Sequence, residues 1–451
     1  MNPDSSDWRF GAAGLASVAR LRRELLPSSL AWAAAQLPWY RRRFQGRWRA
    51  VRGPKDLPKL PLLTKEEAVA HQGELLAGER RAFAGTISSG TQHGNRRPLR
   101  VPATEAEGWA LGAYESARSG PAPRGERGLV LEVLSMQHGV PEGPPPPGVL
   151  RMPWTFTANA FRLFEELLEA RQPGGRRVRY LIAGAGAIVP LTVHLLEKGR
   201  DPARFGIREI GTTGFRLSDC WRSRLAALWG AEVFDNYSLS ELATPAVECR
   251  ACGFHHWGSP PLVFEVLDAF THVPLERGTG LLAVTTLYPF VQAMPLVRYL
   301  TGDLVELGPR CRAAQDRGFA PRGRASQALL RRGLRGEPIV VSAQDVECFL
   351  DGRPEAAREP HPCQTLGLVR SPDVGVVRFD LSWSGRRARV RAELRFDPRL
   401  FPEEAESLGQ GLAAHLLAKS PRLRRLEAGG AGELEVELVA PGTLTRRWSK
   451  F

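Results

Sequence analysis

The sequence lacks any long apolar run. A membrane-spanning helix needs about 18 to 20 consecutive apolar residues, and no segment of the 451-residue chain approaches that length. The opening residues, MNPDSSDWRF, have neither the basic start nor the apolar core of a secretory signal. We therefore expect no signal peptide, no membrane partner and a cytoplasmic location.

The chain is also poor in cysteine and short of acidic residues. Six cysteines in 451 residues do not form the disulfide framework of a small secreted protein. Against 62 Lys and Arg residues there are 48 Asp and Glu residues, which gives a net charge of +14. This excess is spread along the chain and matches no nucleic-acid-binding module, so we expect no nucleic-acid partner. A basic surface favours other anionic partners, such as nucleotides, coenzyme A or acidic carrier proteins.

What the chain does contain is ample apolar residue for a core. Hydrophobic residues make up 43% and charged residues 24%, which indicates a globular protein of two or three domains. After an amphipathic helix, NAFRLFEELLEA, residues 178–238 alternate strand, helix, strand, helix, strand. Their segments are VRYLIAGAG, LTVHLLEKG, GIREIGTTG, SDCWRSRLAALWG (capped by Ser218 or Asp219) and AEVFDNYS. This order predicts a parallel α/β sheet with ligands bound where strands run into loops.

The pattern changes after about residue 320. The segment RARVRAELRF (387–396) alternates apolar and charged residues, which predicts a half-buried strand. It would pair with VGVVRFDLSW through a turn at Ser384–Gly385. A helix from about 402 to 419 and a strand ELEVELV complete a small α+β unit. We place a domain boundary near residues 321–323.

Three cysteines and two adjacent histidines suggest a metal site. Cys249 and Cys252 form a C-x2-C pair, His255 and His256 follow at once, and Cys311 lies further along. Three thiolates and one imidazole complete a closed tetrahedral zinc site, with either histidine as the fourth ligand. The alternative interpretation is three unlinked buried or free thiols.

The segment TISSGTQHGNRRP (86–98) is rich in small and hydroxyl residues. Such residues let the backbone approach an anion closely, and hydroxyl and N–H groups can then hold its oxygens. The segment is not the familiar nucleotide loop, because no Lys-Ser or Lys-Thr pair follows its last glycine. A solvated surface turn is the alternative.

This loop is followed by four further motifs, and a distinctive segment precedes it. The earlier segment is LPWYRRRF…VRGPKDLPKLPLLTKEEA, and the later motifs are DNYSLSELATPAVEC, VRYLTGDLVEL, GRASQALLRRG and PGTLTRRWSKF. In order and spacing they resemble the adenylate-forming (ANL) ligases, most closely the phenylacetate–coenzyme A ligase branch. The resemblance runs from about residue 37 to residue 451. It implies an α/β fold with a large multi-layer domain (1–322) for ATP and the acid, and a small mobile α+β domain (323–451).

The resemblance also implies an activity. Such a ligase uses ATP to convert a carboxylic acid, here expected to be aromatic, into an acyl-adenylate. It then transfers the acyl group to coenzyme A as a thioester. A carrier-protein thiol or an amine could replace coenzyme A, and a degenerate member could serve as a non-catalytic binding protein. The oligomeric state is left open, with a homodimer as one alternative.

Residue roles follow from the same resemblance. In YSLSE, Tyr237 would lie against the adenine, Ser240 would touch phosphate and Glu241 would ligate Mg²⁺, a metal that prefers carboxylate and phosphate oxygens. In YLTGD, Asp303 would accept hydrogen bonds from both ribose hydroxyls. The loop residues expected to hold the ATP phosphates are Ser88, Ser89, Gly90, Thr91 and Gly94.

Two basic residues are expected to complete the site. In GRASQ, Arg324 would lie beside the ribose, and Lys450 would meet the charge that develops at the α-phosphate and carboxylate. Taken singly, Glu241 could be a helix N-terminal acid, Asp303 a turn residue and Lys450 part of a frayed tail. The resemblance further implies that the Cys/His group binds structural zinc and ties two loops together, because members of this branch carry Cys/His residues in these regions.

Overall fold

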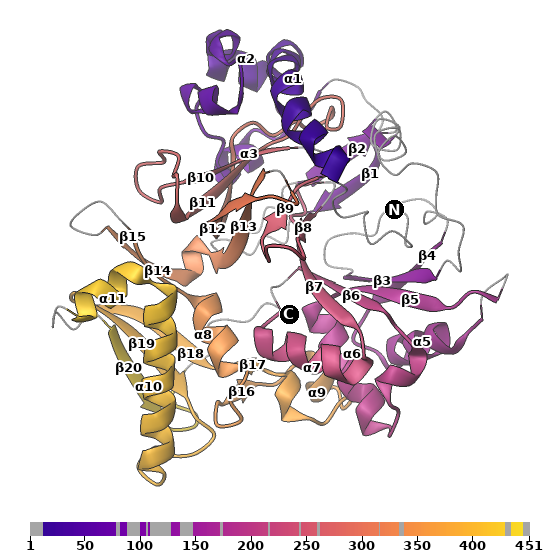
Figure 1. The fold of residues 1–451 in the computed structure, drawn as a ribbon, viewed down its shortest axis with the longest axis vertical. Coiled ribbons are helices and arrows are strands. Elements are labelled where there is room, and N and C mark those ends of the chain that lie inside the picture. The colour runs from indigo at the N-terminus through magenta and orange to yellow at the C-terminus, as the bar shows by residue number, and fades with distance from the viewer. Residues whose placement is uncertain are drawn as a thin grey trace. The chain divides into compact units, whose positions relative to one another are not determined.

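The chain folds into two units that are each discontinuous in sequence (Figure 1). The computed structural model describes residues 12–77, 82–87, 100–104, 107–108, 128–135, 148–171, 175–214, 217–242, 245–258, 262–314, 316–332, 338–428 and 434–444. Unit 1 comprises Met1–Trp154, Ala170–Ile182 and Asp235–Pro321, and unit 2 comprises Thr155–Glu169, Ala183–Phe234 and Arg322–Phe451. The predicted domain boundary near residue 322 stays a prediction, because these units are not a simple division of the chain into two pieces.

Unit 1 combines N-terminal helices with most of the strands. The helices are α1 (Ala12–Gln36), α2 (Pro38–Phe44), η1 (Arg47–Ala50), η2 (Pro54–Lys59) and α3 (Lys65–Ala70). The strands that lie wholly within the unit are β1 (Ala82–Ile87), β2 (Arg100–Thr104), β3 (Leu129–Ser135), β4 (Val149–Trp154), β8 (Ala246–Glu248), β9 (His255–His256), β10 (Val263–Leu267), β11 (Gly278–Thr285) and β12 (Tyr299–Cys311). Three strands cross the unit boundary: β5 (Val178–Gly184), β7 (Glu232–Tyr237) and β13 (Asp316–Arg324).

Six strands of the large sheet follow the order β10-β11-β12-β13-β9-β8, and β1 and β2 form a separate two-stranded sheet. The pairs β10–β11, β11–β12, β13–β9 and β8–β9 are antiparallel, whereas β3 and β4 are parallel with Val130 opposite Val149. In β11 the residues from Leu281 to Thr285 are all buried. Such a continuous apolar run is expected where both faces of a strand are covered.

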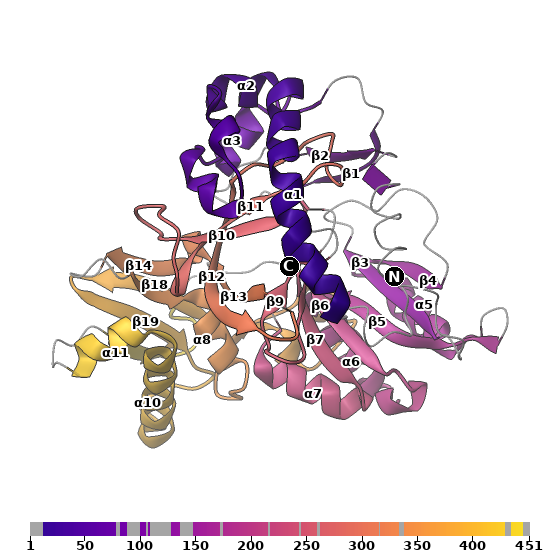
Figure 2. The same cartoon turned by 45° about the horizontal axis from the view of Figure 1, so that its top comes forward.

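The N-terminal helices cover this sheet: α3 contacts β12, and α2 packs on α1 (Figures 1 and 2). The fully buried Tyr40 hydroxyl donates to the Pro295 carbonyl at 3.0 Å and accepts from the Val297 N–H at 2.9 Å. Leu63 forms a parallel bridge with Tyr299, the first residue of β12. The segment that precedes α3 is therefore fixed directly to the strand that carries Asp303.

Unit 2 contains helices and strands from two parts of the chain. From the first part come α5 (Ala158–Glu169), α6 (Ala185–Glu197), η5 (Pro202–Phe205), β6 (Glu209–Thr213) and α7 (Asp219–Trp229). The second part contains η6 (Ala325–Gln327), β14 (Ala328–Arg332), β15 (Pro338–Ser342), α8 (Ala343–Leu350), β16 (Arg358–Glu359), α9 (Pro362–Thr365), η7 (Pro372–Val374), β17 (Val376–Val377), β18 (Phe379–Ser384), β19 (Arg387–Glu393), α10 (Pro402–Lys419), α11 (Pro421–Ala428) and β20 (Leu434–Val439).

One predicted boundary in unit 2 is wrong. The sequence predicted a strand over residues 178–186 that runs into a tight turn, and a helix from 191, but β5 ends at Gly184 and α6 already begins at Ala185. Gly184 serves as its N-cap residue, and burial from Ala187 to Val193 favours the earlier start because the extra turn adds apolar contact. The cap of α7 is Ser218, whose side chain accepts a hydrogen bond from the Trp221 N–H at 3.3 Å.

The predicted C-terminal α+β unit is present. β18 and β19 form a hairpin with Ser384 opposite Arg387, and β20 pairs with β19 in parallel. The side chains on one face of β19, Ala388, Val390 and Ala392, are fully buried. The helix α10 has the predicted bounds, and Figures 1 and 2 show it beside this sheet. The prediction of a mixed α/β fold with a large sheet is confirmed.

Candidate active site and metal centre

Asp303 and Tyr237 are brought together within unit 1. The Tyr237 hydroxyl, at the end of β7, donates to Oδ2 of Asp303 in β12 at 2.6 Å. Both belong to motifs that the sequence linked to nucleotide binding, although they are 66 residues apart. The Asp303 side chain is almost fully buried, and a buried carboxylate is stable only with hydrogen-bond donors or cations around it.

A bulge in β12 places Asp303. Leu281 pairs with Leu304 and Ala283 pairs with Leu300, so residues 301–303 lie opposite Leu282 alone. Gly302 has a φ of 79°, a left-handed conformation that favours glycine. The Thr301 hydroxyl donates to the Leu282 carbonyl at 3.0 Å and accepts from the Asp303 N–H at 3.1 Å. The Thr-Gly-Asp sequence thus encodes the bulge as well as the acid.

Glu241 also contacts β12. Its Oε1 accepts a hydrogen bond from the Tyr299 hydroxyl at 3.0 Å and lies 3.2 Å from the Lys65 ammonium nitrogen. The carboxylate is thus held by a phenol from β12 and a cation from the start of α3. A buried carboxylate of this kind offers the oxygen ligand that Mg²⁺ prefers.

Of the other residues predicted to bind the nucleotide, only Ser240 and Arg324 lie within the described part of the chain. Ser240 lies in the turn after β7, directly before Glu241. Arg324 ends β13 and belongs to unit 2, so its role stays a prediction. The predicted phosphate-loop residues and the terminal lysine lie outside the described residues: Ser88, Ser89, Gly90, Thr91, Gly94 and Lys450.

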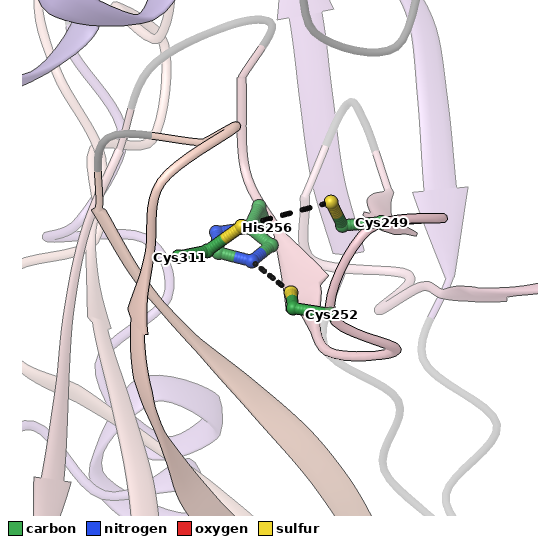
Figure 3. A group of neighbouring side chains, drawn as sticks. All are labelled: Cys249, Cys252, His256 and Cys311. Atoms are coloured by element: carbon green, nitrogen blue, oxygen red, sulfur yellow. Dashed lines mark hydrogen bonds between the residues drawn. The ribbon is translucent and has the colours of Figure 1, made fainter.

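Four predicted metal ligands converge in unit 1. Figure 3 shows Cys249 and Cys252 on one turn, His256 on β9 and Cys311 at the end of β12, with all four ligand atoms within 4.8 Å of one another. The Cys249 and Cys311 sulfurs are 3.9 Å apart, and the Cys252 sulfur is 3.4 Å from His256 Nε2. Tetrahedral zinc with bonds of about 2.3 Å to sulfur and about 2.0 Å to nitrogen needs separations of roughly 3.8 and 3.5 Å. The residues present therefore fit zinc.

The structure distinguishes the two histidines. Because β9 is extended, neighbouring side chains lie on opposite faces, and only His256 joins the cysteines. His255 instead stacks on Phe319 with ring centres 5.9 Å apart, and its Nε2 lies 3.4 Å from Oδ2 of Asp235. His255 is therefore not part of the Cys/His group.

Backbone geometry shapes the metal centre. The Gly253 N–H donates to the Cys249 carbonyl at 2.8 Å, and the Cys249 N–H donates to the Phe254 carbonyl at 2.9 Å, which closes the C-x2-C turn. The Ala314 N–H donates to the Cys311 sulfur at 3.4 Å. A Cβ at Gly318 would lie 2.6 Å from His256 Nε2, so glycine is needed for the imidazole to occupy this place.

The pKa values of three of these side chains are not shifted in one common direction. Burial lowers the pKa of His256 to about 4, so its imidazole is neutral and can donate a lone pair. Burial raises the pKa of Cys252 to about 12. Burial also acts to raise the pKa of Cys311, but the Ala314 N–H and the neighbouring thiols outweigh it, and that pKa is lowered. Cys311 is thus the more readily ionised of these two thiols.

Comparison with known proteins identifies the fold. No family model matches the chain. A segment of 122 residues is 38% identical to the phenylacetate-coenzyme A ligase of Thermus thermophilus, covering 25% of this chain and 27% of that relative. The match therefore spans about a quarter of the relative's length. An open conformation of 2-hydroxyisobutyryl-CoA ligase, in complex with 2-HIB-AMP and CoA, is 14% identical with a TM-score of 0.68, covering 100% of this chain and 95% of that one.

The fold is that of the adenylate-forming superfamily. The acyl acid amido synthetase AtGH3.15, in complex with 2,4-DB, shares it with 14% identity and a TM-score of 0.55, over 96% of this chain and 88% of that one. Among the described residues, no helix is both long and apolar enough to cross a membrane.

Within this adenylate-forming fold, two residues of the site were missed by sequence reasoning. Lys65 belongs to the segment PLLTKEEA, which contributed to the resemblance but was given no role. Tyr299 directly precedes the Leu-Thr-Gly-Asp run and contacts Glu241 rather than Asp303. Each contact joins segments far apart in the chain, and no local pattern signals such a pair.

Proposed function

We propose that the chain is an acyl-coenzyme A ligase that activates a carboxylic acid with ATP and then forms a thioester. The contact that supports this most directly is Tyr237 with Asp303, because it joins two motifs of adenylate-forming enzymes within one unit. The fold and the relative named phenylacetate-coenzyme A ligase support the same activity. That relative also supports an aromatic acid as the substrate.

The residues of unit 1 suit the nucleotide half of this reaction. Asp303 would accept hydrogen bonds from the ribose hydroxyls, since carboxylate oxygens can each accept more than one. The Tyr237 hydroxyl holds the Asp303 carboxylate at 2.6 Å, which limits its rotamers and leaves the ring to contact the base. Glu241 would hold Mg²⁺, which when bound offsets the charge of the phosphates. Ser240, Arg324, Lys450 and the loop from Ser88 to Gly94 keep the roles that the resemblance implies.

The test is acid-dependent release of pyrophosphate from Mg-ATP. The panel of acids includes phenylacetate and 2-hydroxyisobutyrate, each with and without coenzyme A. Asp303→Asn removes a charge-assisted hydrogen-bond acceptor worth about 1.5–3 kcal/mol, so the rate should fall roughly ten- to hundredfold. The matched control is Glu66→Gln, which changes an exposed carboxylate near the site and should leave the rate unchanged. If the protein binds ATP but no acid elicits pyrophosphate, it is a binding protein and the proposal is wrong.

The acyl acceptor is tested separately. The coenzyme A ligases among the relatives support a thiol acceptor, whereas AtGH3.15, an acyl acid amido synthetase, supports an amine as the second candidate. After adenylate formation we would add, in separate reactions, coenzyme A, a carrier-protein thiol and a set of amines. The product of each reaction is identified by mass spectrometry. A thioester of coenzyme A is expected, and an amide as the main product would overturn that choice.

We further propose that Cys249, Cys252, His256 and Cys311 bind one structural zinc ion. Three thiolates and one imidazole leave no open position for a substrate, which is typical of structural sites. The fit of the measured separations to tetrahedral zinc supports this role. Metal analysis of protein purified without added zinc should find about one equivalent per chain.

A further inference from the structure

The side chain of Lys65 is unusually buried for a lysine. Lys65 is the first residue of α3, and its side chain is only 13% exposed, while that of its partner Glu241 is 6% exposed. Burying an ammonium group is costly unless an anion compensates it. The described contact with Glu241, at 3.2 Å, supplies that compensation. The pair is thus a buried ion pair and not an incidental surface contact.

Two sets of backbone contacts fix this position. Thr64 caps α3 in a capping box, in which its side chain accepts from the Glu67 N–H while the Glu67 side chain accepts from the Thr64 N–H. Leu63 is hydrogen-bonded to the start of β12, through its N–H to the Arg298 carbonyl and its carbonyl to the Leu300 N–H. Lys65 therefore projects from a segment that is held on both sides.

Two acidic residues follow Lys65 in α3: Glu66 is exposed, and Glu67 is already engaged. The Glu67 carboxylate pairs with Arg43 at 3.0 Å besides its role in the capping box. The Glu241 carboxylate, by contrast, accepts from an uncharged phenol, Tyr299. The charge of Glu241 is therefore balanced in this structure by Lys65.

We infer that Lys65 is a positioning residue that neutralises Glu241 before nucleotide binding and gives up this carboxylate when Glu241 takes a magnesium ion. The inference rests on the proposed role of Glu241 in the ATP site. While Lys65 occupies Glu241, the carboxylate does not repel an incoming polyphosphate.

The proposed role of Lys65 predicts a change in the metal dependence of ATP binding that the loss of a purely structural lysine would not cause. Without Lys65, the unpaired Glu241 repels metal-free ATP, so binding in the presence of EDTA should weaken. The same unpaired carboxylate binds a divalent cation without competition, so half-saturation with Mg²⁺ should need less metal. Both changes increase the metal dependence of ATP binding. Binding at one of two coupled sites typically changes the affinity of the other about five- to fiftyfold. A general loss of structure would weaken both forms of binding equally.

The experiment is equilibrium binding of ATP, measured by calorimetry, to the parent and to Lys65→Met. Dissociation constants are determined in EDTA and over a series of Mg²⁺ concentrations, without any acid substrate, so no turnover is needed. For Lys65→Met, the ratio of the metal-free to the metal-saturated constant should rise roughly five- to fiftyfold. Lys65→Arg keeps the charge and should restore much of the parent ratio.

Two controls separate the alternatives. Lys59→Met removes a lysine from an exposed pair with Asp56 and should leave the ratio unchanged. In a Glu241→Gln background, Lys65→Met should no longer alter the ratio, because the charge that it neutralises is gone. An unchanged ratio in Lys65→Met, with ATP binding intact in the parent, would overturn the inference. If the parent itself does not bind Mg-ATP, the failure lies with the proposed function.

Discussion

Loss of the proposed zinc ion should open a defined part of unit 1. Cys249 and Cys311 are 62 residues apart in sequence, so a shared ion closes a loop of that length. Treated as a cross-link, a loop of about 60 residues stabilises the folded state by roughly 4 kcal/mol through the lost freedom of the unfolded chain. Chelation, or Cys311→Ser, should remove most of this amount.

The assay is hydrogen exchange followed by mass spectrometry, which reports opening segment by segment. A loss of about 4 kcal/mol corresponds to about a thousandfold faster exchange where local opening governs exchange. The increase should be confined to peptides around β8, β9 and the end of β12. Peptides from β18–β20 serve as the internal reference, and Cys220→Ser, which removes a thiol outside the Cys/His group, is the matched control variant.

Two results would refute this reasoning. Folded parent protein that contains no metal, with slow exchange around β9, would show that the four ligand side chains pack without an ion. Cys311→Ser that retains one equivalent of zinc and parent-like exchange would show that Cys311 is not a ligand.

Three further predictions concern single side chains. Tyr237→Phe should destabilise the protein by about 1–3 kcal/mol, because buried Asp303 loses a donor; no coupling between the two residues in a double-mutant unfolding cycle would contradict the contact. Gly318→Ala should lower the bound zinc, since its Cβ meets the metal-site imidazole, whereas Gly73→Ala, with open space around it, should not; equal zinc contents would reject the packing argument. Burial lowers the pKa of His361 to about 4, so its folded state favours the neutral ring. Its contribution to stability should fall by about 3 kcal/mol as the pH drops from 6.5 to 4, and His361→Asn should lack this component in pH-dependent unfolding.

Local patterns predicted local structure well. The alternation in β19 predicted the burial of Ala388, Val390 and Ala392, because the side-chain period of a strand depends on no distant residue. It did not predict that Glu393, a charged residue at the end of the strand, is buried as well. The start of α6 was missed because Gly184 and Gly186 resemble a turn, and the apolar contacts that favour helix there are tertiary. Propensity is a weak guide where packing decides.

The candidate site was predictable only in part, for a related reason. Spacing grouped Cys249, Cys252 and the histidines, but the choice of His256 needed the pairing of β9, which sets the face of each side chain. The Lys65–Glu241 pair depends on the docking of the α3 segment against β12, which no motif in either segment encodes. Family resemblance assigns roles to single residues, whereas charge balance between residues is visible only in the fold.

The short strand β9 connects the proposed zinc site with the packing around Tyr237. β9 spans only His255 and His256, too short to hold its register alone, and it is paired on one side with β8 and on the other with Phe319 of β13. On one face His256 joins the metal ligands, and on the other His255 stacks on Phe319.

Phe319 is fully buried and also meets the ring of Tyr237 edge-on, with ring centres 5.2 Å apart. An ion that fixes His256 therefore fixes the register of β9, and through Phe319 it supports the tyrosine that holds Asp303. A zinc ion in this position would affect the proposed reaction through the structure alone, without taking part in the chemistry. Removal of the ion should first open β9 and only then disturb the Asp303 carboxylate, which is proposed to bind ribose. Faster hydrogen exchange around β9 should therefore precede any loss of ATP affinity.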